Sequence, residues 1–147
     1  MEIHAGQRIH FVGIGGVRMS ALAELLHRRG CLISGTDRQA SPLTQRLSEM
    51  GIDVRIGHSA EALGEPDLVI STPAVGADNP ELLAAASSSL PVMKGARLLG
   101  ELTAGRQMVA VSGTHGKTTT TAMTAAVLTA GGLDPTVLVG GVLEEGE

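Results

Sequence analysis

Aromatic residues, cysteine and lysine are almost missing from this chain. Phe11 is the only aromatic side chain among 147 residues, so the core has to be built from Ala, Val, Leu, Ile and Met. Cys31 is the only cysteine, which excludes an intramolecular disulfide framework, and it is predicted to be a small buried residue near the start of a strand. The two lysines are Lys94 and Lys117, and all other basic residues are arginine.

Long hydrophobic runs and a strongly basic composition are also missing. The formal net charge is −4 and the pI is about 5.7, whereas a nucleic-acid-binding domain needs a basic face. No apolar run approaches the length of a membrane span, and Glu2, His4 and Arg8 stand where a signal peptide would be apolar. These absences predict a cytoplasmic protein that binds neither nucleic acid nor membrane.

Strand and helix patterns alternate along the first 105 residues, with short connections between them. The predicted strands cover residues 8–12, 31–34, 53–56, 68–71 and 91–93, and the predicted helical segments cover 18–29, 42–50, 59–63, 79–86 and 96–104. This alternation is typical of an α/β fold with a parallel sheet covered by helices. Ligands of such sheets bind at the carboxyl ends of the strands.

A glycine turn follows the first predicted strand. Gly13-Ile14-Gly15-Gly16 precedes the predicted helix 18–29, and backbone N–H groups at a helix start favour an anion. The turn is similar to a dinucleotide fingerprint, with Asp37 at a suitable distance for a ribose contact. Arg18 occupies the third glycine position, which weakens the interpretation as an NAD site. We expect a phosphate-bearing ligand here, with a tight turn that binds nothing as the alternative.

Polar residues also end the fourth predicted strand. Ser71 and Thr72 lie at its carboxyl end, and the expected strand order places this end beside the first strand. Their hydroxyls would face the same crevice as the glycine turn. Turn chemistry alone is an equally good explanation for the residues that follow, Pro73 and Gly76.

A second glycine loop lies between residues 109 and 121, whose sequence is VAVSGTHGKTTTT. The run 109–111 is predicted to be a buried strand, and a helix is predicted to start near Lys117. A glycine loop in this position points backbone N–H groups at a phosphate. Lys117 can reach the β- and γ-phosphates of a nucleotide triphosphate, and the Thr118 hydroxyl can take a Mg²⁺ position. His115 is either a catalytic base or a residue that makes a positional hydrogen bond.

The chain divides near residues 105–107. Residues 1–105 form a complete series of strands and helices, whereas residues 106–147 contain one strand, the loop, one helix and a strand near 136–139. A piece of about 40 residues cannot bury much surface by itself. We therefore expect a whole domain over 1–105 and the incomplete start of a second over 106–147. The unpaired edge after Val139 leaves a homodimer open.

Five motifs occur in one order and resemble the N-terminal part of the Mur ligase family. They are IHFVGIGG at 9–16, SGTD at 34–37, ADNPE at 77–81, VSGTHGKTTTTAM at 111–123 and GLDPT at 132–136. The similarity is greatest to the branch that adds the first amino acid. It implies an α/β protein with a Rossmann-like sheet that binds a UDP-linked sugar, followed by the first βαβ unit of a P-loop central domain.

The resemblance also implies an activity, an ATP-dependent and Mg²⁺-dependent ligation of L-alanine to UDP-N-acetylmuramate through an acyl phosphate, in peptidoglycan synthesis. Lys117 and His115 would be the catalytic residues, and Thr118 the metal ligand. The implied ATP-binding residues are Gly113, Thr114, His115, Gly116, Lys117, Thr118 and Thr119. The implied UDP-binding residues are Gly13, Gly15, Gly16, Asp37, Ser71 and Thr72.

The chain departs from the family pattern in three ways. Arg18 replaces a small residue, Ser112 stands where alanine is common, and the chain ends before the remaining metal ligands and the third domain. We therefore expect an N-terminal fragment that is inactive alone. The alternatives are an NAD-type binding module with an unrelated tail, a fragment of a murein-peptide recycling ligase, and a non-functional remnant.

Overall fold

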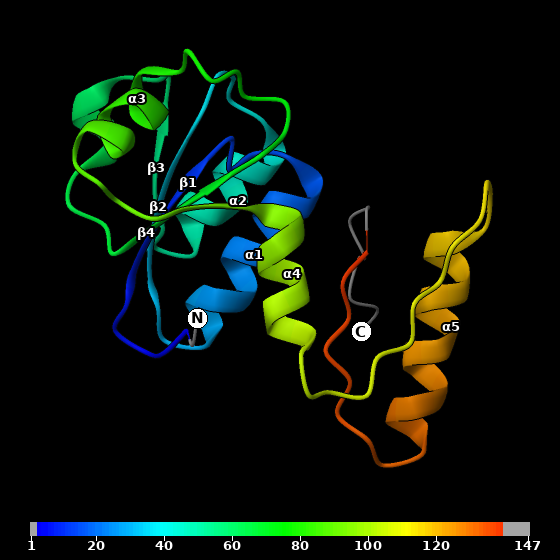
Figure 1. Cartoon of the computed structure of the whole chain (residues 1–147). Coiled ribbons are helices and arrows are strands. Elements are labelled where there is room, and N and C mark those ends of the chain that lie inside the picture. Colours follow the sequence, from blue (N-terminus) through cyan, green and yellow to red (C-terminus); the bar gives the residue numbers. More distant parts are fainter. Residues whose placement is uncertain (1–2, 140–147) are drawn as a thin grey trace. The chain divides into compact units, whose positions relative to one another are not determined.

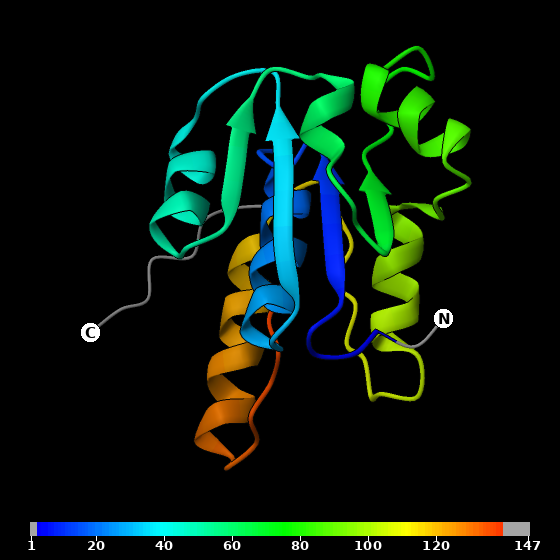
Figure 2. The same cartoon turned by 90° about the vertical axis from the view of Figure 1, so that its left-hand side faces the viewer.

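The computed structural model describes residues 3–139, which form two compact units, one up to Ala104 and one from Gly105 onward. The first unit contains a five-stranded parallel sheet in the order β3-β2-β1-β4-β5 (Figures 1 and 2). Its strands are β1 (Arg8–Val12), β2 (Leu32–Asp37), β3 (Asp53–Ile56), β4 (Leu68–Ser71) and β5 (Val92–Lys94). The predicted Rossmann-like α/β fold is confirmed, and β1 and β4 lie side by side as expected.

Helices cover both faces of this sheet. They are α1 (Val17–Arg28), α2 (Pro42–Glu49), α3 (Pro80–Ser87), α4 (Gly95–Thr103) and the short 3₁₀ helix η1 (Ala60–Leu63). Helix α1 contacts α2 and α4 on one face, whereas α3 and η1 pack together on the other. The predicted segments are all present, with ends displaced by a few residues. The largest displacement is in β2, which continues to Asp37 because it pairs with both β1 and β3.

Side-chain caps fix the starts of two helices at the positions that the sequence favours. The Ser41 hydroxyl accepts a hydrogen bond from the Thr44 backbone N–H, and the Thr44 hydroxyl accepts one from the Ser41 N–H. At the start of α3, the side-chain oxygen of Asn79 accepts hydrogen bonds from the N–H groups of Glu81 and Leu82. The second cap is important for the site because it places Glu81 in the first turn of α3.

The core is aliphatic, apart from one aromatic ring. Phe11 and Ile9 alternate along β1 with His10 and Val12, so each face of the sheet receives one pair. All four side chains are at most 1% exposed. Cys31 is 3% exposed, which confirms its prediction as a buried residue. The polar ring of His10 inside this core needs a buried partner, and the site described below supplies it.

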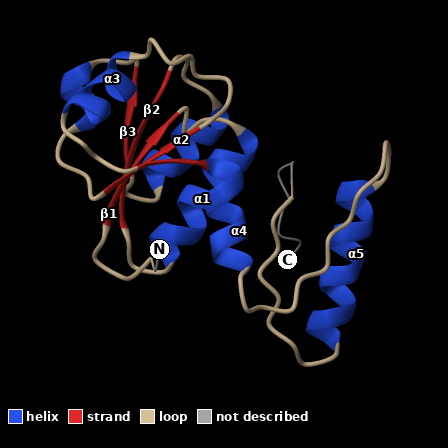
Figure 3. Cartoon of the chain, viewed as in Figure 1, coloured by secondary structure: helices blue, strands red, loops and turns tan. Residues whose placement is uncertain are grey.

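The second unit contains one regular element within the described residues, the helix α5 (Lys117–Ala130) (Figure 3). The predicted strands at 109–111 and 136–139 are wrong: both stretches lack ladder hydrogen bonds. Val109 is 68% exposed, so the expected burial is absent too. A strand requires a neighbour whose backbone pairs with it, and no such neighbour exists in the described part of this unit. No helix within residues 3–139 is long and apolar enough to span a membrane.

Candidate functional site

The glycine turn after β1 is held by the end of β2. Gly13 has a left-handed backbone with φ of 85°. The N–H groups of Gly13 and Ile14 both donate to the Thr36 carbonyl, at 2.8 and 2.9 Å, and Gly16 N–H closes the turn on the Gly13 carbonyl at 3.4 Å. The turn is therefore rigid, and α1 starts directly after it.

Gly15 is a tightly packed position of the turn. Its N–H donates to Asp37 Oδ2 at 2.8 Å. A Cβ at this position would lie 2.8 Å from both Asp37 Oδ2 and Thr44 Cγ2, so only glycine fits. The other carboxylate oxygen of Asp37 accepts from Gln39 N–H at 3.2 Å. In this structure Asp37 therefore orients the glycine turn, and its predicted contact with a ligand stays a prediction.

The amino end of α1 presents free hydrogen-bond donors. Ser20 N–H makes the first bond of the helix, to the Gly16 carbonyl at 2.8 Å. The N–H groups of Val17, Arg18 and Met19 have no partner within residues 3–139. The first turn contains no acidic side chain, and the exposed Arg18 adds a positive charge. Three free donors, a helix dipole and a cation together favour an anionic group at this place.

Ser71 and Thr72 lie beside this turn, as the sequence predicts. Ser71 pairs with Val12 in the sheet register, one residue before the turn. Thr72 contacts the turn so closely that a Cβ on Gly13 would lie 2.6 Å from Thr72 Cγ2. Within the described residues, Ser71 Oγ is the only fully buried side-chain oxygen or nitrogen without a hydrogen-bond partner. Such an orphaned hydroxyl is costly, and a bound ligand is one way to satisfy it.

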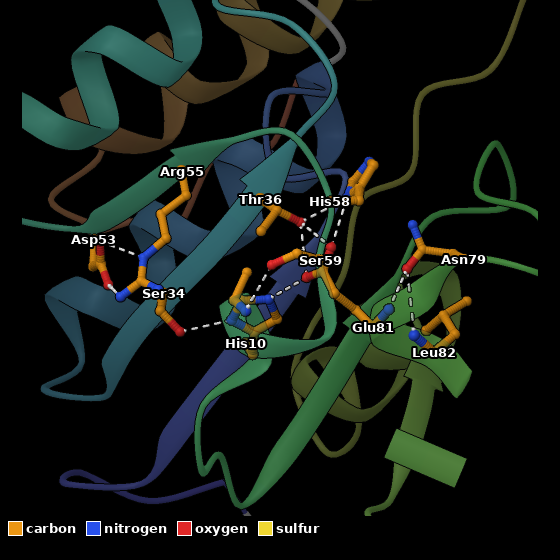
Figure 4. A network of polar contacts seen from close by, with 11 residues as sticks. His10, Ser34, Thr36, Asp53, Arg55, His58, Ser59, Asn79, Glu81 and Leu82 are labelled. Carbon is orange, nitrogen blue, oxygen red and sulfur yellow. Dashed lines mark hydrogen bonds and ion pairs between the residues drawn. The ribbon is translucent and has the colours of Figure 1, made fainter. Parts of the chain in front are cut away.

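A buried carboxylate network lies on the α3 face of the sheet (Figure 4). Glu81 is 0% exposed. Its oxygens lie 2.7 Å from His10 Nε2, 2.6 Å from His58 Nδ1 and 2.8 and 2.9 Å from the Thr36 hydroxyl. The opposite nitrogen of His10 contacts the Ser34 hydroxyl at 2.8 Å. Burial raises the pKa of Glu81, but hydrogen bonds from His10, Thr36 and His58 outweigh it and hold the pKa below its usual value.

The sequence interpretation missed this network. His58 follows a short predicted strand and belongs to no motif, yet its side chain is only 18% exposed and contacts Glu81. A glutamate in the first turn of a helix usually faces solvent, so Glu81 gave no signal by itself. One signal was present: His10, Ser34 and Thr36 are polar residues at alternating positions of two central strands, and buried polar side chains require partners.

The second glycine loop folds around Lys117. The Lys117 ammonium donates to the carbonyls of Gly113 and Thr114, at 2.6 and 3.3 Å. Gly116 has a left-handed backbone with φ of 76° and begins α5 without a side-chain cap. These two hydrogen bonds hold the ammonium group over the loop.

Donors at the start of α5 are also free. The first helical bond runs from Thr120 N–H to the Gly116 carbonyl at 2.9 Å, which leaves the N–H groups of Lys117, Thr118 and Thr119 without a partner in the described part of the chain. The hydroxyls of Thr118 and Thr119 make no hydrogen bond within residues 3–139 either. His115 is exposed. The donor set fits a phosphate group, and the roles predicted for these residues stay predictions.

The comparison with protein families gives a match over most of the chain. The model of the Mur ligase family, catalytic domain, matches residues 8–107. The chain is 52% identical to UDP-N-acetylmuramate--L-alanine ligase of Rhizobium meliloti (strain 1021) over 135 residues. This matched region is 92% of this chain and 29% of the relative. The chain thus spans less than a third of the length of this curated relative.

Solved structures agree with this match. A UDP-N-acetylmuramate-alanine ligase from Thermotoga maritima superposes with a TM-score of 0.88 at 40% identity, over 92% of this chain and 32% of that one. A UDP-N-acetylmuramate:L-alanyl-gamma-D-glutamyl-meso-diaminopimelate ligase from Neisseria meningitides superposes with a TM-score of 0.86 at 36% identity. This match covers 97% of this chain and 45% of the other. Sequence and fold together show that this chain belongs to the Mur ligase family.

Proposed function

We propose that residues 1–105 bind the UDP end of UDP-N-acetylmuramate at the glycine turn after β1. The observation that carries the proposal is the set of free N–H groups at Val17, Arg18 and Met19, directly after the glycine turn. Ser71, whose buried hydroxyl has no partner, pairs with Val12 one residue before that turn. The three amides would bind the diphosphate, and Gly13, Gly15, Gly16, Asp37 and Thr72 would shape the crevice around it. The glycines permit close approach of the ligand to the backbone.

The loop 113–119 would bind the phosphates of ATP. Gly113, Thr114, Gly116 and Thr119 would surround the phosphates with backbone and hydroxyl donors, and Thr118 would ligate Mg²⁺. The Lys117 ammonium would move from the loop carbonyls to the phosphate oxygens, where it would neutralise charge that develops during transfer. His115 is exposed beside the loop and would make a positioning hydrogen bond to the phosphates or act as a base.

The reaction would be the cytoplasmic ligation of L-alanine to UDP-N-acetylmuramate in peptidoglycan synthesis. Transfer of a phosphoryl group from ATP to the substrate carboxylate gives an acyl phosphate, and attack of the L-alanine amine then releases phosphate. Support for L-alanine over a peptide comes from identity to the solved structures, which is 40% to the UDP-N-acetylmuramate-alanine ligase of Thermotoga maritima and 36% to the L-alanyl-gamma-D-glutamyl-meso-diaminopimelate ligase of Neisseria meningitides. The contribution of residues 1–139 is positioning and charge neutralisation.

Calorimetry with the 147-residue chain tests the first half of the proposal. Titration with UDP-N-acetylmuramate should give saturable heat, and NADH, the ligand of an NAD-type module, should give none. Absence of heat at millimolar UDP-N-acetylmuramate would count against the proposed UDP site. Saturable binding of NADH in its place would indicate a dinucleotide module.

A chimera tests the activity. The 135-residue region that matches the Rhizobium meliloti ligase can replace the corresponding part of that enzyme. The chimera should form UDP-N-acetylmuramoyl-L-alanine with consumption of ATP, because the residues that hold both phosphate groups come from this chain. A chimera that folds and binds neither nucleotide would refute the assignment of both loops.

A further inference from the structure

One carbonyl of β2 holds the start of the glycine turn. The Thr36 carbonyl accepts the N–H groups of both Gly13 and Ile14, at 2.8 and 2.9 Å. Thr36 is the last residue but one of β2, and its partner in the sheet, Val12, is the last residue of β1. The two bonds therefore form where the ladder between these strands ends. Because hydrogen bonds are directional, the orientation of one peptide group controls both of them.

The side chain of the same threonine is held by Glu81 (Figure 4). The Thr36 hydroxyl lies 2.8 and 2.9 Å from the two carboxylate oxygens of Glu81, and both residues are 0% exposed. His10 contacts the same carboxylate from β1 at 2.7 Å, and the Asn79 cap fixes the backbone of Glu81 at the start of α3. A hydroxyl that donates to a buried, fixed carboxylate has one orientation. Glu81 thus fixes the residue whose carbonyl holds the turn.

A second connection runs through the loop between β4 and α3. At the beginning of this loop, Thr72 and Val75 pack on the turn, because a Cβ on Gly13 would lie 2.6 Å from Thr72 Cγ2 and 3.5 Å from Val75 Cγ2. At its end, Asn79 caps α3, and Glu81 is anchored to β1 and β2. A loop that is fixed at its far end keeps its near end packed against the turn.

Attachment of α3 to the sheet does not by itself require a carboxylate. This face of the sheet already has a buried apolar cluster, which consists of Val12, Leu63, Val69 and Ala85. Burial of a charge costs desolvation free energy, and well-packed apolar side chains of similar volume often replace a buried ion pair without loss of stability. What the carboxylate of Glu81 adds is direction, since it accepts hydrogen bonds from side chains of two neighbouring strands.

We propose that Glu81 is a positioning residue for the diphosphate site, which it serves through the Thr36 carbonyl and the loop at 72–79 without touching the ligand. The inference rests on the proposed UDP site. It assigns the shape of the phosphate-binding turn to a residue that lies in a helix on one face of the sheet and 65 or more positions away in the sequence from Gly13, Gly15 and Gly16.

Amide hydrogen exchange of the ligand-free 147-residue chain tests the link between Glu81 and the turn. Glu81→Gln should accelerate exchange of the Gly13 and Ile14 N–H groups about tenfold, and Leu68→Ala should accelerate it less. Leu68 provides the matched control, because it is 0% exposed at the start of β4, and loss of its side chain destabilises the core at least as much. A merely structural Glu81 would give the reverse order, since exchange would then follow global stability alone.

Kinetics of the chimera proposed above test the link to the ligand. Glu81→Gln should raise the KM for UDP-N-acetylmuramate about tenfold, the equivalent of one hydrogen bond, and change kcat and the KM for ATP by less than twofold. Thr36→Val removes the hydroxyl and keeps the shape of the side chain, so it should reproduce this increase. Thr36→Ser keeps the hydroxyl and should restore most of the affinity. Leu68→Ala should leave the KM for UDP-N-acetylmuramate at the wild-type value.

The outcomes separate this inference from the proposed function. Turn exchange that is no faster in Glu81→Gln than in Leu68→Ala would overturn the inference alone. An unchanged KM for UDP-N-acetylmuramate in Glu81→Gln, or equal KM values for Thr36→Val and Thr36→Ser, would also overturn it and leave the UDP site standing. A wild-type chain without saturable binding of UDP-N-acetylmuramate would overturn the proposed function and this inference with it.

Discussion

Replacement of Glu81 by glutamine changes one atom of a side chain that is fully buried and contacts His10, Thr36 and His58. Hydrogen bonds to a charged group contribute roughly 1.5–3 kcal/mol each, and their losses do not add. Glutamine keeps one acceptor oxygen, and the histidines can change tautomer. We therefore expect the free energy of unfolding to fall by about 2 kcal/mol, which lowers the melting temperature by about 10 °C for a unit of this size.

The effect should depend on pH with a definite sign. The hydrogen bonds from His10, Thr36 and His58 hold the pKa of Glu81 below its usual value against the opposing effect of burial. A carboxyl group with a lowered pKa in the folded state stabilises that state above the pKa of the unfolded chain. The difference between wild type and Glu81→Gln should therefore be constant near neutrality. It should shrink as the pH falls below about 4.3, the ordinary value for glutamate.

Thermal unfolding followed by circular dichroism at several pH values measures the loss of stability and its dependence on pH. Glu65→Gln is the matched control, because the Glu65 side chain is 92% exposed and forms only a long ion pair with Arg8, at 3.9 Å, within the described residues. The control should have the same melting temperature as the wild type. Equal melting temperatures for wild type and Glu81→Gln at neutral pH would refute the argument that the buried carboxylate holds the strands and α3 together.

Three further predictions concern single positions. Ser71→Ala should stabilise the chain by about 1 kcal/mol in thermal unfolding, because the hydroxyl it removes is buried and unpaired, and should weaken UDP-N-acetylmuramate binding. Gly35→Ala should lower the free energy of unfolding by roughly 2 kcal/mol, because the new Cβ would lie 2.7 Å from Ile14 Cδ1. Gly100→Ala is the control, because a Cβ there meets open space, and it should raise the free energy of unfolding slightly. Reversed signs for the two variants would refute the packing argument. Lys117→Ala in the chimera should lower the ligation rate about a hundredfold, and unchanged turnover would exclude Lys117 from the mechanism.

Local patterns were sufficient to predict the first unit. Ser41-Pro42 and Asn79-Pro80 start helices in the structure because capping and proline preferences act within a few residues. The three strands at 8–12, 53–56 and 68–71 have the predicted bounds. Ser71 and Thr72 meet the glycine turn because parallel strands bring their carboxyl ends to one edge.

Contacts between residues far apart in the sequence explain the features that sequence patterns did not predict. The run 109–111 is apolar and β-branched, yet it forms no strand, since pairing depends on a neighbour and not on propensity. Glu81 and His58 are 23 residues apart, and their contact forms only after β1, β2 and α3 are assembled. A sequence pattern shows that His10 needs a partner but not which carboxylate supplies it.

Amide spectra of the ¹⁵N-labelled 147-residue chain test the central claim most directly, that the glycine turn and the start of α1 bind the diphosphate of a UDP-linked sugar. Addition of UDP-N-acetylmuramate should produce saturable shifts that are largest for the N–H groups of residues 15–19. Saturable shifts concentrated elsewhere, with the signals of residues 15–19 unchanged, would contradict the account.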